Sequence, residues 1–177
     1  WLDEGTQQSS IMRFLTLRQC AINLFVSNTV QRRHAVLGDT RYASLPPDQQ
    51  HKVDSVSGCY MFVRREVIQQ IGGLDTRFFM YGEETEWCHR AAGVGWDVVY
   101  NPDIQILHHG AASTAHMSEW KAVEMTRGQI LFLRLTRGSL VAWLAALLMA
   151  LRDAIRAPFY GLLALSKGFK LSAGGRA

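Results

Sequence analysis

The sequence predicts an α/β fold. Between residues 54 and 137, segments with the spacing of strands alternate with segments that have the spacing of helices, and glycine or proline separates them. Such alternation is typical of domains in which helices pack on a sheet. With 48% hydrophobic and 19% charged residues among 177, the chain has enough apolar surface to form a core, which excludes a disordered tail.

The number of cysteines and the distribution of charge further limit the class of protein. Three cysteines are too few for a disulfide scaffold and favour a reducing compartment. The net charge of +4 divides into +1 over residues 1–56, −3 over 57–116 and +6 over 117–177. The acidic middle therefore predicts a site for a metal or for hydroxyl activation, and the basic end predicts contact with phosphate.

The first segment, residues 1–53, predicts one helix and a connection. Ser9 and Ser10 precede apolar residues at helical spacing, so we expect an N-cap followed by a helix that runs to about Asn28. Residues 29–52 are polar and carry turn signals, which predicts a surface connection. The chain opens without an initiator methionine or a basic leader, and we expect that it begins inside a larger domain.

The second segment, residues 54–116, carries the alternation. Residues 56–63 are apolar on both faces, as in a strand of a covered sheet. Glycines close each helical stretch, as residues that permit a left-handed conformation do. In chain order we expect a strand at 56–63, a helix at 64–71, a helix at 83–92, and strands at 96–100 and 103–108.

The third segment, residues 117–177, predicts helices. A long helix is expected over 117–137, and the uncharged run that follows at 139–151 is too short to span a bilayer. Pro158 then predicts a bend before a second apolar stretch. Two arrangements are open, a buried helical hairpin or an amphipathic pair in a membrane surface with its basic residues toward anionic lipid. The charge of +6 favours the membrane surface.

Glu83, Glu84 and Glu86 form the densest chemical signal. They stand in the first turn of an expected helix, where the helix dipole favours ionised carboxylates. An ionised carboxylate at the mouth of a pocket can take a proton from a hydroxyl that becomes a nucleophile. The alternative is an ordinary acidic helix start in which Glu86 pairs with Arg90 one turn later.

His108 and His109 form a second signal, at the end of an expected strand. An imidazole in such a position can bind a divalent cation, although a histidine pair is more often a surface or core feature. The sequence contains no zinc spacing, no Walker-type phosphate loop and no G-x-G-x-x-G motif, which argues against a zinc hydrolase.

Six short motifs follow one another through residues 54–113. They are Val56-Ser57-Gly58, Ile71-Gly72-Gly73-Leu74-Asp75, Phe78-Phe79-Met80-Tyr81-Gly82-Glu83-Glu84, Cys88-His89-Arg90, Tyr100-Asn101-Pro102 and His108-His109-Gly110. Together and in this order they resemble the second half of a family 2 glycosyltransferase, most closely the rhamnosyltransferase-like branch that builds bacterial cell-surface polysaccharides.

The resemblance implies a fold and a set of roles. The fold would be the C-terminal half of a GT-A, Rossmann-like domain, with residues 1–53 as its variable stretch, 54–116 as its catalytic half and 117–177 as a helical, membrane-associated extension. The implied roles are Glu84 as general base, where the family more often has Asp, Glu83 as its acidic partner, Asp75 near the acceptor, Ser57, Gly58 and Trp87 as substrate-binding residues, and His108 as a ligand of Mn²⁺ or Mg²⁺.

The implied reaction is inverting transfer of a sugar from a nucleotide-sugar to a hydroxyl of a lipid-linked or growing glycan, at the inner face of the cell membrane. The family's D-x-D motif is absent from this sequence, so the nucleotide-binding half would precede Trp1 and the 177 residues alone would not transfer sugar. The absence of Q-x-x-R-W favours addition of a single sugar. The alternative is a non-catalytic membrane-binding or scaffolding module. Nucleic-acid binding is disfavoured, because the basic residues stand among apolar runs.

Overall fold

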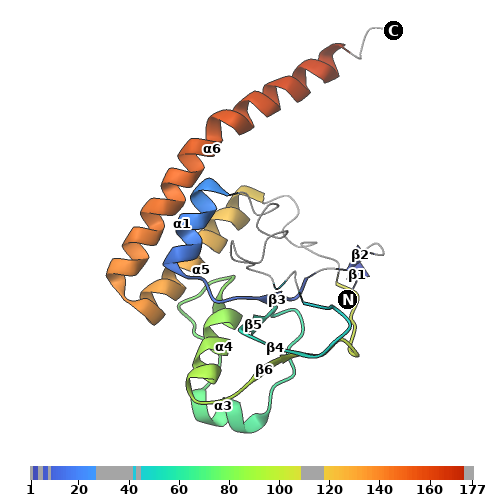
Figure 1. Ribbon diagram of the computed structural model, residues 1–177, viewed down its shortest axis with the longest axis vertical. Coiled ribbons are helices and arrows are strands. Elements are labelled where there is room, and N and C mark those ends of the chain that lie inside the picture. The colour runs from blue at the N-terminus through green and yellow to red at the C-terminus, as the bar shows by residue number, and fades with distance from the viewer. Residues whose placement is uncertain are drawn as a thin grey trace.

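The structure, a computed structural model, describes residues 2–3, 6–7, 9–26, 42, 45–108 and 118–173. It contains two groups of elements (Figure 1). Helices α1 (Leu17–Phe25), α5 (Ser118–Arg137) and α6 (Ser139–Ala173) lie together. Helices α3 (Arg65–Ile71) and α4 (Glu83–Gly93) lie with most of the short strands.

The strands form three antiparallel pairs of two strands each among the described residues. β1 (Leu2–Asp3) pairs with β2 (Thr6–Gln7), β3 (Ile11–Met12) with β5 (Ser55–Val56), and β4 (His51–Val53) with β6 (Val98–Tyr100). Ile11 lies opposite Val56, and Val53 opposite Val98. Helices and small sheets are thus mixed, as an α/β fold predicts, but the described strands do not join into one extended sheet.

The expected helix from Ser10 begins later than its apolar spacing suggests. Residues Ile11–Met12 form β3, and α1 begins at Leu17 with Thr16 as its N-cap, whose hydroxyl accepts from the backbone N–H of Gln19 at 3.2 Å. The Phe14 N–H donates to the carboxylate of Asp54 at 2.9 Å. Pairing with residues 54–56 therefore holds this segment extended. Asn28 lies outside the described residues.

Two of the strand predictions are wrong for most of their length. The strand expected at 56–63 ends at Val56, and a turn follows at Gly58–Cys59, so that Phe62 is 90% exposed. The segment expected as a strand at 103–108 is irregular, with an isolated bridge at Leu107. A strand needs a neighbour for its ladder of hydrogen bonds. Within the described residues neither segment has such a neighbour over its length.

Four of the described strands were missed, namely the short β1, β2 and β3 and also β4, whose first two residues lie in the stretch expected as a surface connection. His51 and Lys52 are polar, so residues 51–53 have no apolar run to announce a strand. Their pairing with Val98–Tyr100 is a contact between segments far apart in the chain. The prediction of a strand at 96–100 is confirmed over those three residues.

The helices of the middle segment are confirmed. Gly72, with φ 76°, ends α3, and Gly95, with φ 92°, follows the end of α4. These are left-handed values that glycine adopts without a steric penalty. Helix α5 is also confirmed and continues through Gly128.

Helix α6 is a single helix of 35 residues that continues through Pro158, so the two apolar stretches expected on either side of that proline belong to one helix. Gly138, with φ 93°, separates α6 from α5. The helices α5 and α6 form a hairpin, and α1 packs against α6. Their shared core is apolar and consists of Cys20, Phe78, Phe132, Leu133, Ala142, Ala145 and Met149. The side chain of Arg156 donates to the carbonyl of Asn23 at 2.8 Å, at the C-terminal end of α1. No helix in the described part of the chain is both long and apolar enough to cross a membrane.

Candidate active site

The site begins at the aromatic turn, which we define as residues 78–82, between the loop after α3 and the start of α4. Phe78 is buried in the core shared by the helices. Tyr81 and Gly82 both have left-handed backbones, with φ 68° and 99°, and Gly82 is the N-cap of α4. The two residues reverse the chain so that α4 starts with Glu83 and Glu84 in its first turn.

Glu84 is the carboxylate that this turn encloses. Its Oε2 accepts a hydrogen bond from the backbone N–H of Gly82 at 3.1 Å. A Cβ added to Gly58 would lie 3.6 Å from the Cβ of Glu84, so the turn after β5 packs against its side chain. Burial raises the pKa of Glu84, and the adjacent Glu83 adds to the rise, against backbone N–H groups that lower it. A raised pKa makes a carboxylate a stronger base when it is ionised.

The other two carboxylates of the cluster differ from Glu84 and from each other. Oε2 of Glu83 is buried and has no hydrogen-bond partner in the part of the chain that the structure describes. Glu86 is buried and accepts from Nε of Arg90 at 2.7 and 2.9 Å. The pairing that the sequence suggested for Glu86 is present, which makes Glu86 a structural residue.

Gly58 packs against Glu84, and Ser57 precedes Gly58 in the same turn. The Ser57 N–H donates to the carbonyl of Ser10 at 2.7 Å, so the ladder between β3 and β5 leads directly into this turn. Both residues are at least partly accessible. The structure thus brings together Ser57, Gly58, Glu83 and Glu84.

Trp87 and Asp75 are held by other contacts. Trp87 is buried with Val67, Cys88 and Ala91, and its Nε1 donates to the carbonyl of Gly72 at 2.9 Å. Asp75 accepts from the backbone N–H of Arg77 at 2.9 Å and from its guanidinium, and these bonds lower the pKa of Asp75 to about 2. Each of the two side chains stabilises the loop between α3 and α4.

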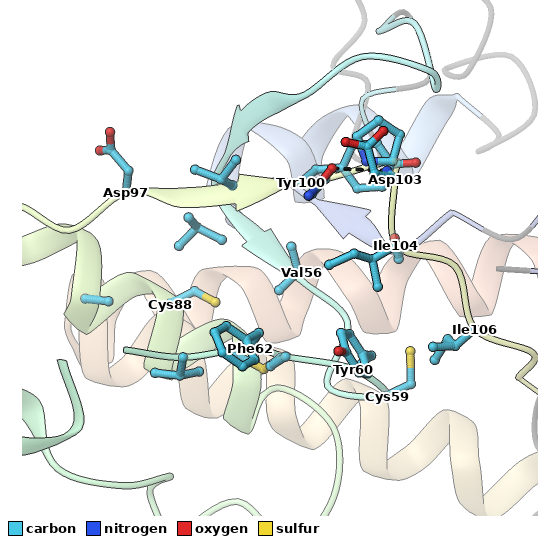
Figure 2. A pocket seen from close by; sticks show the side chains of 18 of the residues that line it. Val56, Cys59, Tyr60, Phe62, Cys88, Asp97, Tyr100, Asp103, Ile104 and Ile106 are labelled. Atoms are coloured by element: carbon cyan, nitrogen blue, oxygen red, sulfur yellow. Dashed lines mark hydrogen bonds between the residues drawn. The ribbon is translucent and has the colours of Figure 1, made fainter. Parts of the chain in front are cut away.

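Figure 2 shows a hollow of about 770 Å³ whose wall includes Val56 and Cys59, which flank Ser57 and Gly58 in the chain. Its volume is in the range of small-molecule sites. Apolar and aromatic side chains from three segments dominate its wall, and Tyr60, Phe62, Trp87, Trp96, Tyr100 and Ile104 are among them. Glu84 does not line it, but Cys88, one turn further along α4, and Cys59, next to Gly58, do.

Three residues near the site have no role in the prediction from the sequence. His89 lies between the rings of Phe14 and Phe132, with centroids 5.1 and 5.6 Å away. Tyr60 and Phe62 line the hollow, and the alternation of aromatic residues after Gly58 is the signal that could have drawn attention to them.

The expected metal ligand, His108, stands at the end of the described segment before α5 and is half-buried. His109 lies outside the described residues. Across the residues that the structure describes, no three His, Cys, Asp or Glu side chains are grouped so that they could hold a metal ion. A divalent cation at His108 would therefore need ligands from elsewhere, and we derive no chemical step through it.

The chain is similar to proteins of bacterial glycan synthesis. It is 38% identical over 91 residues to the N-acetylglucosaminyl-diphospho-decaprenol L-rhamnosyltransferase of Mycobacterium tuberculosis, in strains CDC 1551 / Oshkosh and ATCC 25618 / H37Rv, which covers 46% of this chain and 29% of that protein. It is 30% identical over 128 residues to the O-antigen biosynthesis protein RfbC of Myxococcus xanthus, which covers 64% of this chain and 10% of that protein.

This similarity is partial. The chain spans less than a third of the length of the rhamnosyltransferases that it matches. No family model matches it, and no solved structure matches it. The names of these relatives point to a glycosyltransferase.

Proposed function

We propose that this chain is the catalytic and acceptor-binding half of an inverting glycosyltransferase. The enzyme would move a sugar, with rhamnose favoured, from a nucleotide-sugar to a hydroxyl of a lipid-linked or growing cell-surface glycan. The observation that carries the proposal is the environment of Glu84, a partly buried carboxylate with a raised pKa between the aromatic turn and Gly58. The named activity of the rhamnosyltransferases that it resembles supports the same reaction.

In this proposal Glu84 acts as the general base. The acceptor hydroxyl donates its proton to the carboxylate of Glu84 as its oxygen bonds to the anomeric carbon. The bond from that carbon to the nucleoside diphosphate breaks on the opposite face, so the configuration inverts. Glu83 supports the role, because a second carboxylate beside Glu84 opposes its ionisation and so raises its pKa.

The donor-binding half lies outside this chain in the same proposal. The rhamnosyltransferases are long enough to contain such a half in addition to the part that matches this chain, because the match covers 29% of their length. A divalent cation, Mn²⁺ or Mg²⁺, would stabilise the charge on the leaving diphosphate, with His108 as one ligand and the others supplied by that half. The 177 residues alone are expected to be inactive, and sugar transfer by the isolated chain would contradict this part of the proposal.

The test is the substitution Glu84→Gln in the longest natural polypeptide that contains the chain. A general base contributes about 10²–10⁴-fold to the rate, so turnover should fall by about that factor while the affinity for the nucleotide-sugar stays nearly unchanged. Glu119→Gln is a matched control, because Glu119 is an exposed glutamate in the first turn of another helix, α5. Retained turnover in Glu84→Gln would move the base elsewhere.

A second proposal concerns the membrane, since α6 carries an exposed apolar stripe. Ala142, Ala145 and Met149 face the core, whereas the opposite face is apolar but exposed. Its members fall on one side of the helix and are Leu140, Trp143, Leu144, Leu147, Leu151 and Ile155. With the charge of +6 on residues 117–177, this stripe suits the surface of an anionic bilayer. The enzyme would then act peripherally, at the inner face of the cell membrane.

Sedimentation with phosphatidylglycerol vesicles tests the stripe. The double variant Trp143→Glu, Leu147→Glu should lose most of its vesicle binding, since charges replace its two central exposed side chains. Ile68→Glu is the control, because Ile68 is an exposed apolar residue on α3. Equal binding by all three proteins would contradict the proposal. A purely scaffolding module would bind vesicles in the same way but would show no loss of turnover in Glu84→Gln.

A further inference from the structure

We infer that helix α5 fixes the position of the Glu84 carboxylate through the aromatic turn, and that Gly128 is the positioning residue that allows it. The inference rests on the proposed function only for the role of Glu84. The packing of residues 78–82 against α5 does not depend on whether the protein transfers a sugar. Helix α5, at residues 118–137, lies after the sequence motifs that surround Glu84 and is part of none of them.

Gly128 is where the two segments meet most closely. It is buried in the middle of α5, and a Cβ added to it would lie 2.1 Å from the carbonyl oxygen of Tyr81 and 3.1 Å from its carbonyl carbon. Backbone atoms cannot be approached so closely by any side chain, so only glycine permits this contact. Glycine inside a helix is unfavourable by about 1 kcal/mol relative to alanine. The contact with Tyr81 gives the reason why the helix tolerates it.

The aromatic turn requires a stabilising contact of this kind because its backbone is strained. Tyr81 has φ 68°, a left-handed value that costs a non-glycine residue about 1 kcal/mol or more. Besides Gly128, α5 contacts the turn twice. Trp120 meets Phe79 edge to face, with centroids 6.1 Å apart, and Nζ of Lys121 lies 5.9 Å from the centre of the Tyr81 ring.

The conformation of the turn sets where the carboxylate lies. The peptide between Tyr81 and Gly82 presents its carbonyl to Gly128 and its N–H to Oε2 of Glu84, at 3.1 Å. The same turn starts α4, since the N–H of Glu86 donates to the carbonyl of Gly82 at 2.9 Å. A shift of α5 away from Tyr81 would rotate this peptide and release Glu84 from it. Gly128 therefore acts on Glu84 through one peptide group.

Amide hydrogen exchange measured by NMR on the 177-residue chain tests the inference. In Gly128→Ala, protection at the Gly82 and Glu86 amides should fall about tenfold or more, because local opening of the turn becomes easier. The amides of Gly72 and Trp96, bonded to Ile68 and Ala91, serve as internal references and should keep their protection. A merely structural role would lower all four together. Gly93→Ala is the matched control, since a Cβ at that helical glycine would meet no described atom within 4 Å other than its chain neighbours and its own helix backbone.

A milder variant keeps the test decisive if Gly128→Ala does not fold. Trp120→Ala removes the contact with Phe79 without introducing a clash, and it should lower the protection of Gly82 and Glu86 about threefold. Trp143→Ala, which removes an exposed tryptophan of α6, is its control. Unchanged protection at both amides in Trp120→Ala, or in a folded Gly128→Ala protein, would overturn the inference.

Discussion

The side chain of Glu84 packs against the backbone of Gly58. A Cβ at Gly58 would lie 3.6, 3.8 and 3.9 Å from Cβ, Cγ and Cδ of Glu84. The turn that follows β5 thus covers one side of the carboxylate, and the aromatic turn holds its Oε2. Two segments that are separate in the sequence therefore contact the same group. Its burial raises the pKa of Glu84, whereas the hydrogen bond from the Gly82 N–H opposes the rise.

Glu84→Gln should increase the free energy of unfolding more at pH 7 than at pH 4. The pKa of Glu84 is raised above its ordinary value of 4.5, so its contribution to stability is present below that value and is lost as the pH rises through the folded-state pKa. Glutamine is neutral at both pH values and removes this loss. Urea denaturation at the two pH values measures the difference, with Glu119→Gln on α5 as the matched substitution at an exposed glutamate. A smaller gain at pH 7 would contradict the burial of an ionisable Glu84.

His89 should make the fold less stable as the pH falls below about 6.5. Burial between Phe14 and Phe132 lowers the pKa of His89, Arg137 adds to the effect, and Glu86 opposes it. The unfolded chain then takes up a proton at a higher pH than the folded chain, so stability decreases as the pH falls from 6.5 toward the folded pKa. Thermal unfolding between pH 7 and pH 5 measures this slope.

The comparison for His89 is His89→Phe, which keeps an aromatic ring between Phe14 and Phe132 but cannot be protonated. Its stability should change less over the same pH interval. His51→Phe is the control, because His51 lies in β4, away from this aromatic cluster, and bonds to the carbonyl of Pro46. Equal slopes for the wild-type protein and His89→Phe would show that another group titrates.

Arg90→Ala should destabilise the fold by about 3 kcal/mol. It leaves the buried carboxylate of Glu86 without its partner, and a buried charge that loses its partner typically costs this much. The same guanidinium also donates to the carbonyls of Ile71 and Gly73 after α3. Lys52→Ala is the control, because Lys52 and Asp97 form an exposed pair worth about 0.5 kcal/mol. Similar losses for both variants in urea denaturation would contradict this assignment.

Ala145→Leu should destabilise the fold by about 1–3 kcal/mol, since Ala145 is fully buried where α6 packs on its neighbours and a larger side chain overfills that space. Ala150→Leu, on the exposed part of the same helix, should change stability by less than about 0.5 kcal/mol. Thermal denaturation distinguishes them. Equal effects would mean that α6 does not pack through the face described.

The helices are the part that the sequence predicted well, and for the candidate site it placed Glu83, Glu84 and Glu86 in the first turn of one helix, as the structure has them. Periodicity and closing glycines gave α3, α4 and α5 nearly to their ends, because these signals are local. The strands were predicted poorly. Residues 57–63 have a strand pattern but pair with no described strand over most of their length, whereas β4 has no strand pattern and does pair. Strand formation depends on a partner that is distant in the chain, and periodicity does not report it.

The sequence by itself determined that three glutamates stand at the start of one helix and that an aromatic turn precedes them. Only the tertiary structure decided their separate roles. Glu86 is neutralised by Arg90, whereas Glu84 is buried by Gly58 and held by the peptide that follows Tyr81. The same holds for Gly128, which the sequence marks only as an interruption of a helix. Its proposed role depends on the carbonyl of Tyr81, which folding places against it. The sequence does not reveal this role, because close backbone contacts between distant segments produce no periodic pattern.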